Sequence, residues 1–350
     1  MTLPLTAPPD SLCILRLSAV GDISHALPLV RTIQQAWPRT RLSWIIGKTE
    51  YQLVYDIPDI EFIIFDKKAG WRGYQDVRRH LRKRRFDVLL DMQMSLRASL
   101  LSLFVHSPIK LGFDRHRAKD LQWLFTNHQI AYQPRQHVID SFLGFSEALG
   151  IQQKRLQWDI PIPEEARNTL LEHLPAGKPY LVISPCSSMA YRNWDAERYA
   201  QAADYASKTY DLAVVLSGGP TSIEHEFGRI ISEHCQCTVT NLIGKTSLKQ
   251  LLALLQGAKL VIAPDAGPAH LANAVGTPVI GLYATTNPDR ARPYNWPQYV
   301  VNKYPEAVLA KYGKTIAELP WGTRVREHGT MLRIQIDDVT SMLDRLLSDA

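Results

Sequence analysis

Residues 260–283 contain the residue types that could bind phosphate and a sugar. An apolar strand ends at Pro264 and is followed by a turn with Asp265 and Gly267, and then by a short helix. A strand-to-helix turn that contains glycine directs backbone N–H groups at the helix N-terminus, where negative charge is favoured. Asp265 and His270 add a hydrogen-bond acceptor and a donor. The segment predicts a nucleotide-sugar site, although a βαβ crossover in which Asp265 caps the helix has the same pattern.

A second strand-turn-helix pattern lies near the N-terminus and carries Asp22. The segment from Arg16 to Pro28 has the spacing of neither a dinucleotide-binding motif nor a P-loop. A carboxylate at a helix N-terminus can take a proton from an attacking hydroxyl. Asp22 is therefore a candidate general base, and the alternative is that it only caps the helix.

The composition indicates a globular chain that could form two domains of ordinary size, with 350 residues, 45% of them hydrophobic. The 4 cysteines do not suggest a disulfide framework. The sequence His234-Cys235-Gln236-Cys237 has no second Cys/His pair to complete a zinc motif, so we expect no metal site. The N-terminus does not resemble a signal peptide, and no run approaches the ~18 apolar residues of a membrane span. We expect a cytoplasmic protein.

The formal net charge is +6, and the basic excess is concentrated in one segment. Residues 67–85 contain 9 Lys and Arg residues against a single acid, Asp76. Such a segment predicts a surface for an anionic partner, which could be a phosphorylated saccharide, an anionic membrane or a nucleic acid. A solvated helix face is the alternative for residues 78–85.

Strands and helices alternate along the chain, which predicts parallel sheets covered by helices on both faces. The alternation pauses at residues 150–178, which we interpret as a linker. We therefore expect an α/β protein with two Rossmann-like doubly wound domains, 1–155 and 156–330. The tail, 331–350, is expected to form a helix that packs back across the first domain. Ligands of such sheets bind at the carboxyl ends of the strands, where the turns with Asp22 and Asp265 lie.

Two longer motifs resemble the ADP-heptose:lipopolysaccharide heptosyltransferases of glycosyltransferase family 9. They are Ser18-Ala-Val-Gly-Asp22-Ile-x-His25-Ala-Leu-Pro28 and Pro264-Asp265-Ala-Gly267-Pro-Ala-His270-Leu-Ala. Between them, in the order expected of the family, lie Asp91-x-Gln93, Gly112-Phe113-Asp114, Tyr191-Arg192-Asn193-Trp194 and Ser217-Gly218-Gly219-Pro220. The resemblance covers about residues 12–345. It implies a GT-B fold with a central cleft between the domains and transfer of L-glycero-D-manno-heptose from ADP-heptose with inversion. It also implies Asp22 as the base, and neither a catalytic metal nor a cofactor.

The resemblance also implies which residues contact the donor. Arg192 stands where the family commonly has Lys and would neutralise the leaving diphosphate. Glu224 would accept from the ribose hydroxyls, with Glu226 an open alternative, and adenine would lie near Thr246. Ala266 replaces a threonine common in the family, so a hydroxyl is missing there. The complete set of predicted donor residues is Ser187, Ser188, Arg192, Glu224, Thr246, Asp265, Ala266, Gly267 and His270.

For the acceptor, the resemblance implies the Kdo/inner-core region of lipopolysaccharide, as Kdo-lipid A or a heptosylated inner core. Its acidic sugars and phosphates would need cations on the first domain. The candidates are Lys67, Lys68, Arg72, Arg97, Arg115, Arg117 and His137. We expect peripheral association with the cytoplasmic face of the inner membrane and no nucleic-acid partner. The alternatives are another GT-B nucleotide-sugar transferase or epimerase, or a non-catalytic protein that binds an anionic membrane.

Overall fold

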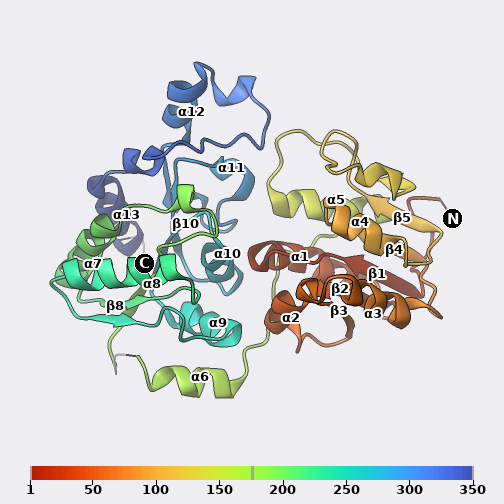
Figure 1. Cartoon of the computed structure of the whole chain (residues 1–350), viewed down its shortest axis with the longest axis horizontal. Helices are drawn as coiled ribbons and strands as arrows, with labels where there is room; N and C mark the ends of the chain where they lie inside the picture. Colours follow the sequence, from red (N-terminus) through yellow and green to blue (C-terminus); the bar gives the residue numbers. More distant parts are fainter. Residues whose placement is uncertain (1, 175–176, 349–350) are drawn as a thin grey trace. The chain divides into compact units, whose positions relative to one another are not determined.

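The computed structural model describes residues 2–174 and 177–348, and the chain forms two compact units, 1–161 and 162–350 (Figure 1). The boundary lies six residues after the expected one. The short helix α6 (Glu164–Leu171), which we had placed in the linker, packs against α9 (Leu248–Gly257) in unit 2. Among the described residues, no helix is both long enough and apolar enough to span a membrane.

Unit 1 is built on a six-stranded parallel sheet in the order β3-β2-β1-β4-β5-β6. Its strands are β1 (Ser11–Leu15), β2 (Arg41–Gly47), β3 (Ile60–Phe65), β4 (Val88–Asp91), β5 (Ile109–Gly112) and β6 (His128–Gln129). Its helices are α1 (Val20–Ala36), α2 (Lys48–Val54), α3 (Trp71–Leu81), α4 (Leu96–Ser102) and α5 (Val138–Leu149), with 3-10 turns η1 (Lys67–Ala69) and η2 (Gln122–Leu124). The central strands β1 and β4 are mostly apolar and are buried along their whole length, as expected of a sheet covered on both faces.

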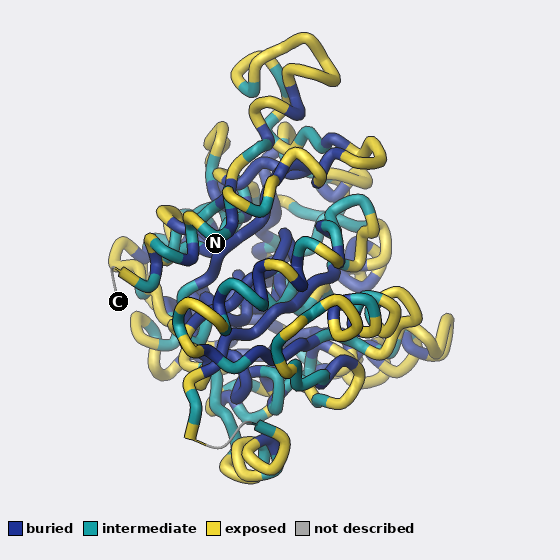
Figure 2. Tube along the Cα trace, turned by 90° about the vertical axis from the view of Figure 1, so that its left-hand side faces the viewer, coloured by how far each residue is buried: buried dark blue, intermediate teal, exposed yellow. Residues whose placement is uncertain are grey.

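Unit 2 repeats this topology, with the strand order β12-β11-β10-β7-β8-β9. Its strands are β7 (Tyr180–Ile183), β8 (Ala213–Leu216), β9 (Val239–Asn241), β10 (Leu260–Pro264), β11 (Val279–Tyr283) and β12 (Val300–Asn302). Its remaining helices are α7 (Ala196–Tyr210), α8 (Ser222–His234), α10 (Gly267–Ala274), α11 (Pro288–Ala291), α12 (Tyr304–Tyr312) and α13 (Ile336–Ser348). The 3-10 turns are η3 (Ala190–Arg192), η4 (Pro297–Tyr299), η5 (Ile316–Glu318) and η6 (Thr330–Arg333). The central strands β7, β10 and β11 are buried along their whole length, and the outward helical turns are exposed, as Figure 2 shows.

Local sequence signals explain where several helices begin. Ser95, Asp195, Thr221 and Ser247 precede α4, α7, α8 and α9, and each side chain accepts a hydrogen bond from a first-turn backbone N–H. Because these first-turn N–H groups have no acceptor within the helix, such caps stabilise the start by about 1 kcal/mol each. Each of these helices follows a strand of its sheet, and candidate site residues lie in or beside the connecting segments.

The C-terminal helix corrects one expectation. We expected the tail to pack across the first domain, but α13 packs within unit 2, against α7 and the edge of its sheet. Val339, Leu343 and Leu346 are buried in the core of unit 2. The hydroxyls of Tyr205 and Tyr210 on α7 both donate to Asp344 Oδ1 at 2.7 Å. The apolar face of the helix therefore completes the core of its own unit.

Candidate active site

Asp22 lies in the first turn of α1, directly after the carboxyl end of β1. Its Oδ2 accepts a hydrogen bond from the backbone N–H of Ala19 at 3.2 Å and lies 2.7 Å from Arg16 Nη2. Arg16 is buried and is held by a 2.6 Å hydrogen bond from Nη1 to the carbonyl of Met92. The Asp22 side chain remains 41% exposed. Asp22 therefore caps the helix and also presents an oriented carboxylate to solvent.

Two histidines extend this arrangement within unit 1. His25 is buried, and its Nδ1 lies 3.9 Å from Asp22 Oδ1. The ring of His137 meets the ring of His25 edge-on, with 6.0 Å between their centroids. His137 also caps α5, because its Nδ1 accepts from the Ile139 N–H at 3.1 Å. The structure thus brings one predicted acceptor residue close to the predicted base.

The other predicted acceptor residues lie at the same sheet edge on both sides of Asp22. Lys67, Lys68 and Arg72 follow β3, whereas Arg97 follows β4 and Arg115 follows β5, and all five are exposed. Neighbouring strands are about 4.8 Å apart, and β1 is central in the sheet. The strands that these cations follow therefore lie about 5–10 Å to either side of β1. Such spacing suits an acceptor with several separated anionic groups.

Arg117, also a predicted acceptor residue, holds its own loop together. Its guanidinium pairs with Asp114 and donates to the Gln136 side chain at 2.8 Å, the Ser141 hydroxyl at 2.9 Å and the Ala131 carbonyl at 2.7 Å. These contacts join the turn after β5 to the start of α5. Arg117 therefore has less donor capacity to offer a ligand than Arg115, whose guanidinium stacks over Trp123 at 4.4 Å.

Asp265 is the centre of a buried charge cluster at the carboxyl edge of the second sheet. Arg192 Nη1 lies 3.2 Å from Asp265 Oδ2 and donates to the Asp265 carbonyl at 3.0 Å. His270 Nε2 lies 3.5 Å from Asp265 Oδ1. Burial acts to raise the pKa of Asp265, but the His270 hydrogen bond and the Arg192 charge outweigh it and lower the pKa to about 2. Asp265 is therefore an anion at any physiological pH.

The start of α10 offers backbone donors beside this cluster. The helix begins at Gly267, and its N-cap residue, Ala266, provides no side-chain cap. The first N–H groups of a helix have no acceptor within it, and Pro268 has no N–H, so the donors are those of Ala266, Gly267 and Ala269. The Nε of Arg192 is buried and has no hydrogen-bond acceptor among the described residues. An anionic ligand here would satisfy both kinds of donor.

The loop after β7 carries the two predicted hydroxyl residues. The Ser187 N–H donates to Asn193 Oδ1 at 2.7 Å, and the Ser187 hydroxyl accepts from the Met189 N–H at 3.3 Å. Ser188 is exposed. Asn193 thus shapes the loop that presents both serines and Arg192.

The structure places Glu224 and the alternative ribose candidate, Glu226, in different surroundings. Glu224 folds back over the turn after β8 and accepts from the Gly219 N–H at 2.7 Å and the Thr221 hydroxyl at 2.6 Å. A Cβ on Gly219 would lie 3.0 Å from this carboxylate, so glycine at this position lets the Glu224 side chain approach the turn closely. Glu226 instead pairs with Arg229 on the exposed surface of α8, at 2.7 Å. Glu224 is the acid at the edge of the sheet.

Thr246 lies in the turn after β9. Gly244 starts this turn with φ +73°, a conformation that favours glycine, and a Cβ there would lie 3.0 Å from the His225 ring. In the strand order β10-β7-β8-β9, the residues Asp265, Arg192, Glu224 and Thr246 follow successive strands. They therefore form a row along the edge of unit 2 that extends about 14 Å.

Sequence reasoning missed two residues that position this chemistry. Arg16 orients Asp22, and Asn193 shapes the serine loop. Arg16 had a detectable signal, because a charged residue inside the apolar run 12–17 is buried with that run and therefore needs a partner. The role of Asn193 depends on loop geometry that no spacing rule encodes.

A third buried group, Asp91 at the end of β4, also lies at the edge of the first sheet. Its Oδ2 is buried without a hydrogen-bond partner among the described residues. Burial raises the pKa of Asp91, and nearby polar and cationic groups lower it by less. The resulting pKa is about 7. The carboxyl is therefore partly protonated near neutral pH.

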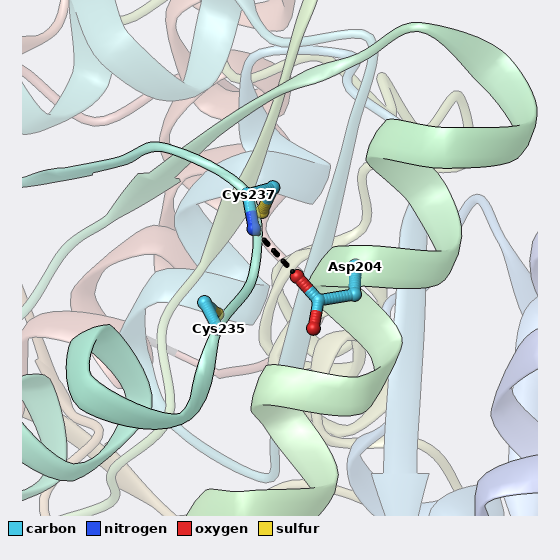
Figure 3. Close-up of side chains that lie close together, drawn as sticks. All are labelled: Asp204, Cys235 and Cys237. Carbon is cyan, nitrogen blue, oxygen red and sulfur yellow. Dashed lines mark hydrogen bonds between the residues drawn. The ribbon is translucent and has the colours of Figure 1, made fainter.

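Asp204, Cys235 and Cys237 form a cluster whose ligand atoms lie within 4.8 Å of one another (Figure 3). The Asp204 carboxylate accepts from the backbone N–H groups of Gln236 and Cys237, at 2.9 Å for its Oδ1 in each case. Three donors are one short of the usual zinc set. The cluster precedes β9 and so lies at the amino edge of the sheet, opposite the row of donor candidates. That the reaction needs no metal ion remains a prediction.

Comparisons with known proteins identify the class. The family model for glycosyltransferase family 9 (heptosyltransferase) matches residues 74–321. The chain is 42% identical over 341 residues to the lipopolysaccharide core heptosyltransferase OpsX of Haemophilus influenzae, covering 97% of this chain and 98% of that one. The chain therefore belongs to glycosyltransferase family 9, the heptosyltransferases, and is an enzyme of that class.

Solved structures confirm the expected GT-B type of α/β fold. A family 9 glycosyltransferase from Veillonella parvula superposes with a TM-score of 0.81 at 22% identity, over 99% of each chain. The Escherichia coli heptosyltransferase WaaC, solved with ADP, superposes with a TM-score of 0.72 at 20% identity, over 96% of this chain and 99% of that one.

Proposed function

We propose that this enzyme transfers heptose from ADP-heptose to the Kdo/inner-core region of lipopolysaccharide. The observation that carries the proposal is the row of Asp265, Arg192, Glu224 and Thr246 along successive strands of unit 2. A nucleotide-sugar has the same sequence of chemical groups: hydroxyls, diphosphate, ribose and base. The name of the Haemophilus influenzae relative and the ADP in the Escherichia coli structure support this donor and acceptor.

Each part of the donor has a partner suited to it. Asp265, which is anionic and held by Arg192 and His270, would accept hydrogen bonds from heptose hydroxyls. The diphosphate would accept from the unpaired Nε–H of Arg192, from the N–H groups at the start of α10 and from the Ser187–Ser188 loop. Glu224 would accept from the ribose hydroxyls, and adenine would lie at the Gly244–Thr246 turn. These donors neutralise the leaving group without requiring a metal ion.

Asp22 would act as the general base in a single displacement. The acceptor oxygen forms a bond to C1 of heptose as the bond from C1 to the phosphate oxygen breaks. The hydroxyl proton passes to the Asp22 carboxylate, and ADP leaves with the bonding electrons, so the anomeric centre is inverted. The negative charge of Asp22 also stabilises an oxocarbenium-like transition state. Arg16 holds the carboxylate in its orientation.

The acceptor would bind the cations that flank Asp22, namely Lys67, Lys68, Arg72, Arg97 and Arg115, with His137 nearest the base. Acidic sugars and lipid phosphates are the natural partners of such cations. Because this acceptor is a membrane lipid, the enzyme would associate peripherally with the cytoplasmic face of the inner membrane.

The test is incubation of the full chain with ADP-heptose and lipopolysaccharides truncated at defined positions, with products measured by mass. We expect a gain of one heptose on an inner-core acceptor, unchanged by a metal chelator. UDP- and GDP-sugars serve as competing donors. Faster transfer from a UDP-sugar, or no transfer to any inner-core acceptor, would refute the assignment.

A further inference from the structure

The outer surface of α4 is apolar and exposed. Leu96, Leu100 and Leu103 are 54%, 38% and 56% exposed. They recur at positions i, i+4 and i+7 and therefore lie on one side of the helix. Ala98 and Leu101, on the other side, are buried in the core against the sheet. The helix is thus apolar on both sides, although only one side is needed for folding.

The loop after β5 adds two more leucines to this surface. Leu121 and Leu124 are 58% and 59% exposed and lie at the two ends of the 3-10 turn η2. Between them, Gln122 is buried and donates to the Asp91 carbonyl at 2.8 Å, which anchors the turn. Asp120 Oδ2 accepts from the Leu96 N–H at 3.3 Å, so this turn lies beside the start of α4.

Leu121 is held outward at some cost to the backbone. Its φ is +57°, a left-handed conformation that leucine rarely adopts. If folding were the only requirement, a buried leucine, or an asparagine that tolerates the left-handed conformation, would be more stable at this position. Its exposure suggests that Leu121 meets a partner.

Basic residues lie on the neighbouring helix. Val77 and Leu81 of α3 share a buried core cluster with Ala98 and Leu101 of α4, so α3 and α4 cover the same face of the first sheet. On α3 and just after it, a set of exposed cations has no acidic partner among the described residues: Arg72, Arg78, Arg82, Lys83 and Arg85. The leucine surface therefore has a basic strip beside it.

We propose that this combined surface docks unit 1 on an anionic lipid bilayer. The five leucines would enter the interfacial region while the cations of α3 contact lipid headgroups. Apolar insertion together with a polybasic patch is the pair of signals that gives stable peripheral attachment. The excess of cations favours an anionic partner over a second copy of the same basic surface. The inference rests on the proposed function only in that the acceptor is a membrane lipid.

The test measures flotation of the full chain with vesicles. The vesicles contain phosphatidylglycerol and phosphatidylethanolamine, or phosphatidylcholine alone. The leucine variant is Leu96→Ser, Leu103→Ser, Leu121→Asn, because asparagine tolerates the left-handed conformation. The matched control changes three apolar residues of similar exposure in unit 2: Leu171→Ser, Ile223→Ser and Leu309→Ser.

We expect the leucine variant to lose about thirtyfold or more in partition to anionic vesicles, because each inserted leucine contributes up to about tenfold. The control should bind like the wild type. A charge variant, Arg78→Gln, Arg82→Gln, Lys83→Gln, should lose about fivefold per charge at low salt, and this loss should shrink as salt screens the charges.

Equal loss in the control, or wild-type partition of the leucine variant, would overturn the proposal. So would a wild-type dimer that the leucine changes dissociate without any vesicle binding. Turnover with a deacylated, water-soluble acceptor is measured on the same preparations and should be unchanged in the leucine variant. If no preparation turns over any acceptor, the proposed function fails, whereas the vesicle result still decides whether this surface docks.

Discussion

The two units carry the same trio of residue types, Arg, Asp and His, at the carboxyl edges of their sheets. In unit 1, Asp22 lies 2.7 Å from Arg16 and 3.9 Å from His25. In unit 2, Asp265 lies 3.2 Å from Arg192 and 3.5 Å from His270. Arg16 is buried, and the Arg192 side chain is 14% exposed. The difference is that the Asp22 side chain is 41% exposed and that of Asp265 only 10%.

This difference in exposure suits the two carboxylates to different tasks. A base must reach the proton that it removes, and Asp22 is accessible to a substrate hydroxyl. A buried anion held on two sides keeps a fixed position and charge, which suits Asp265 to orienting a sugar. Chemistry that moves a proton is thus expected in unit 1, and chemistry that holds charge in unit 2.

The sharpest test of this comparison is Asp22→Asn. Asparagine keeps the size and capping ability of the side chain but cannot accept a proton at neutral pH. We expect kcat to fall by about 10²–10⁴, with the fold and the ADP-heptose affinity retained and a small loss of thermal stability, because buried Arg16 loses its anionic partner. The matched control is Asp76→Asn, which removes an exposed acid from the surface of α3. Near-normal turnover would leave Asp22 as a cap and make His25 the first alternative base.

Removal of the arginine from the buried trio should produce the next largest effect. Arg192→Ala leaves the diphosphate without its cation and Asp265 without its arginine partner, so kcat/KM for the donor should fall by about 30–1000-fold, or 2–4 kcal/mol. Arg192→Lys should recover part of this loss because it restores the charge. Arg229→Ala on exposed α8 is the control. Unchanged turnover at limiting donor would mean that other groups hold the phosphates.

Asp91 tests what happens to a buried acid that lacks such an arginine. Because its pKa is raised to about 7, the folded state binds a proton that the unfolded state has lost. Stability should therefore fall as pH rises from about 4 to about 7, at about 1.4 kcal/mol per pH unit or less. Asp265, with its pKa lowered, contributes in the opposite direction, losing stability only below about pH 4.

Asp91→Asn should remove this dependence. Between pH 5 and pH 6.5, the variant should gain about 2 kcal/mol relative to the wild type. Hydrogen exchange of the amides in β1 and β4 measures the effect within unit 1, where a single unfolding transition for the whole chain would not. A constant difference between the two proteins across this pH range would contradict the raised pKa.

The smallest expected effect is on the donor KM, in a comparison of two acids on α8, Glu224 and Glu226. Glu224→Gln should raise the donor KM about tenfold, because a charged hydrogen bond to the ribose contributes about 1.5 kcal/mol or more. Glu226→Gln should leave the donor KM unchanged, since its carboxylate pairs with Arg229. Competition by ADP against ADP-heptose isolates the nucleotide contribution. If the effects are reversed, the ribose lies on the exposed surface of α8.

Much of the fold could be predicted from the sequence because its signals are local. Apolar strands, cap residues and turn glycines mark most elements to within a few residues, and alternation of strand and helix requires parallel sheets. The parallel sheets in turn bring the turns that follow the strands to one edge. For this reason the sequence could nominate Asp22 and Asp265 from their turns, whereas Arg192 and Glu224 were nominated by the family resemblance, whose motifs lie at the same sheet edges.

Only the tertiary structure decided which partners these residues have. The burial of Asp265 beside Arg192, the contacts that occupy Arg117 and the separation of Glu224 from Glu226 join residues up to 73 positions apart. The position of α13 was also decided by tertiary packing. The apolar side of an amphipathic helix indicates that the helix packs on an apolar surface, but it does not indicate which surface. Residue spacing determined the edge on which the chemistry lies. Packing determined which charges are buried and which remain exposed to a substrate.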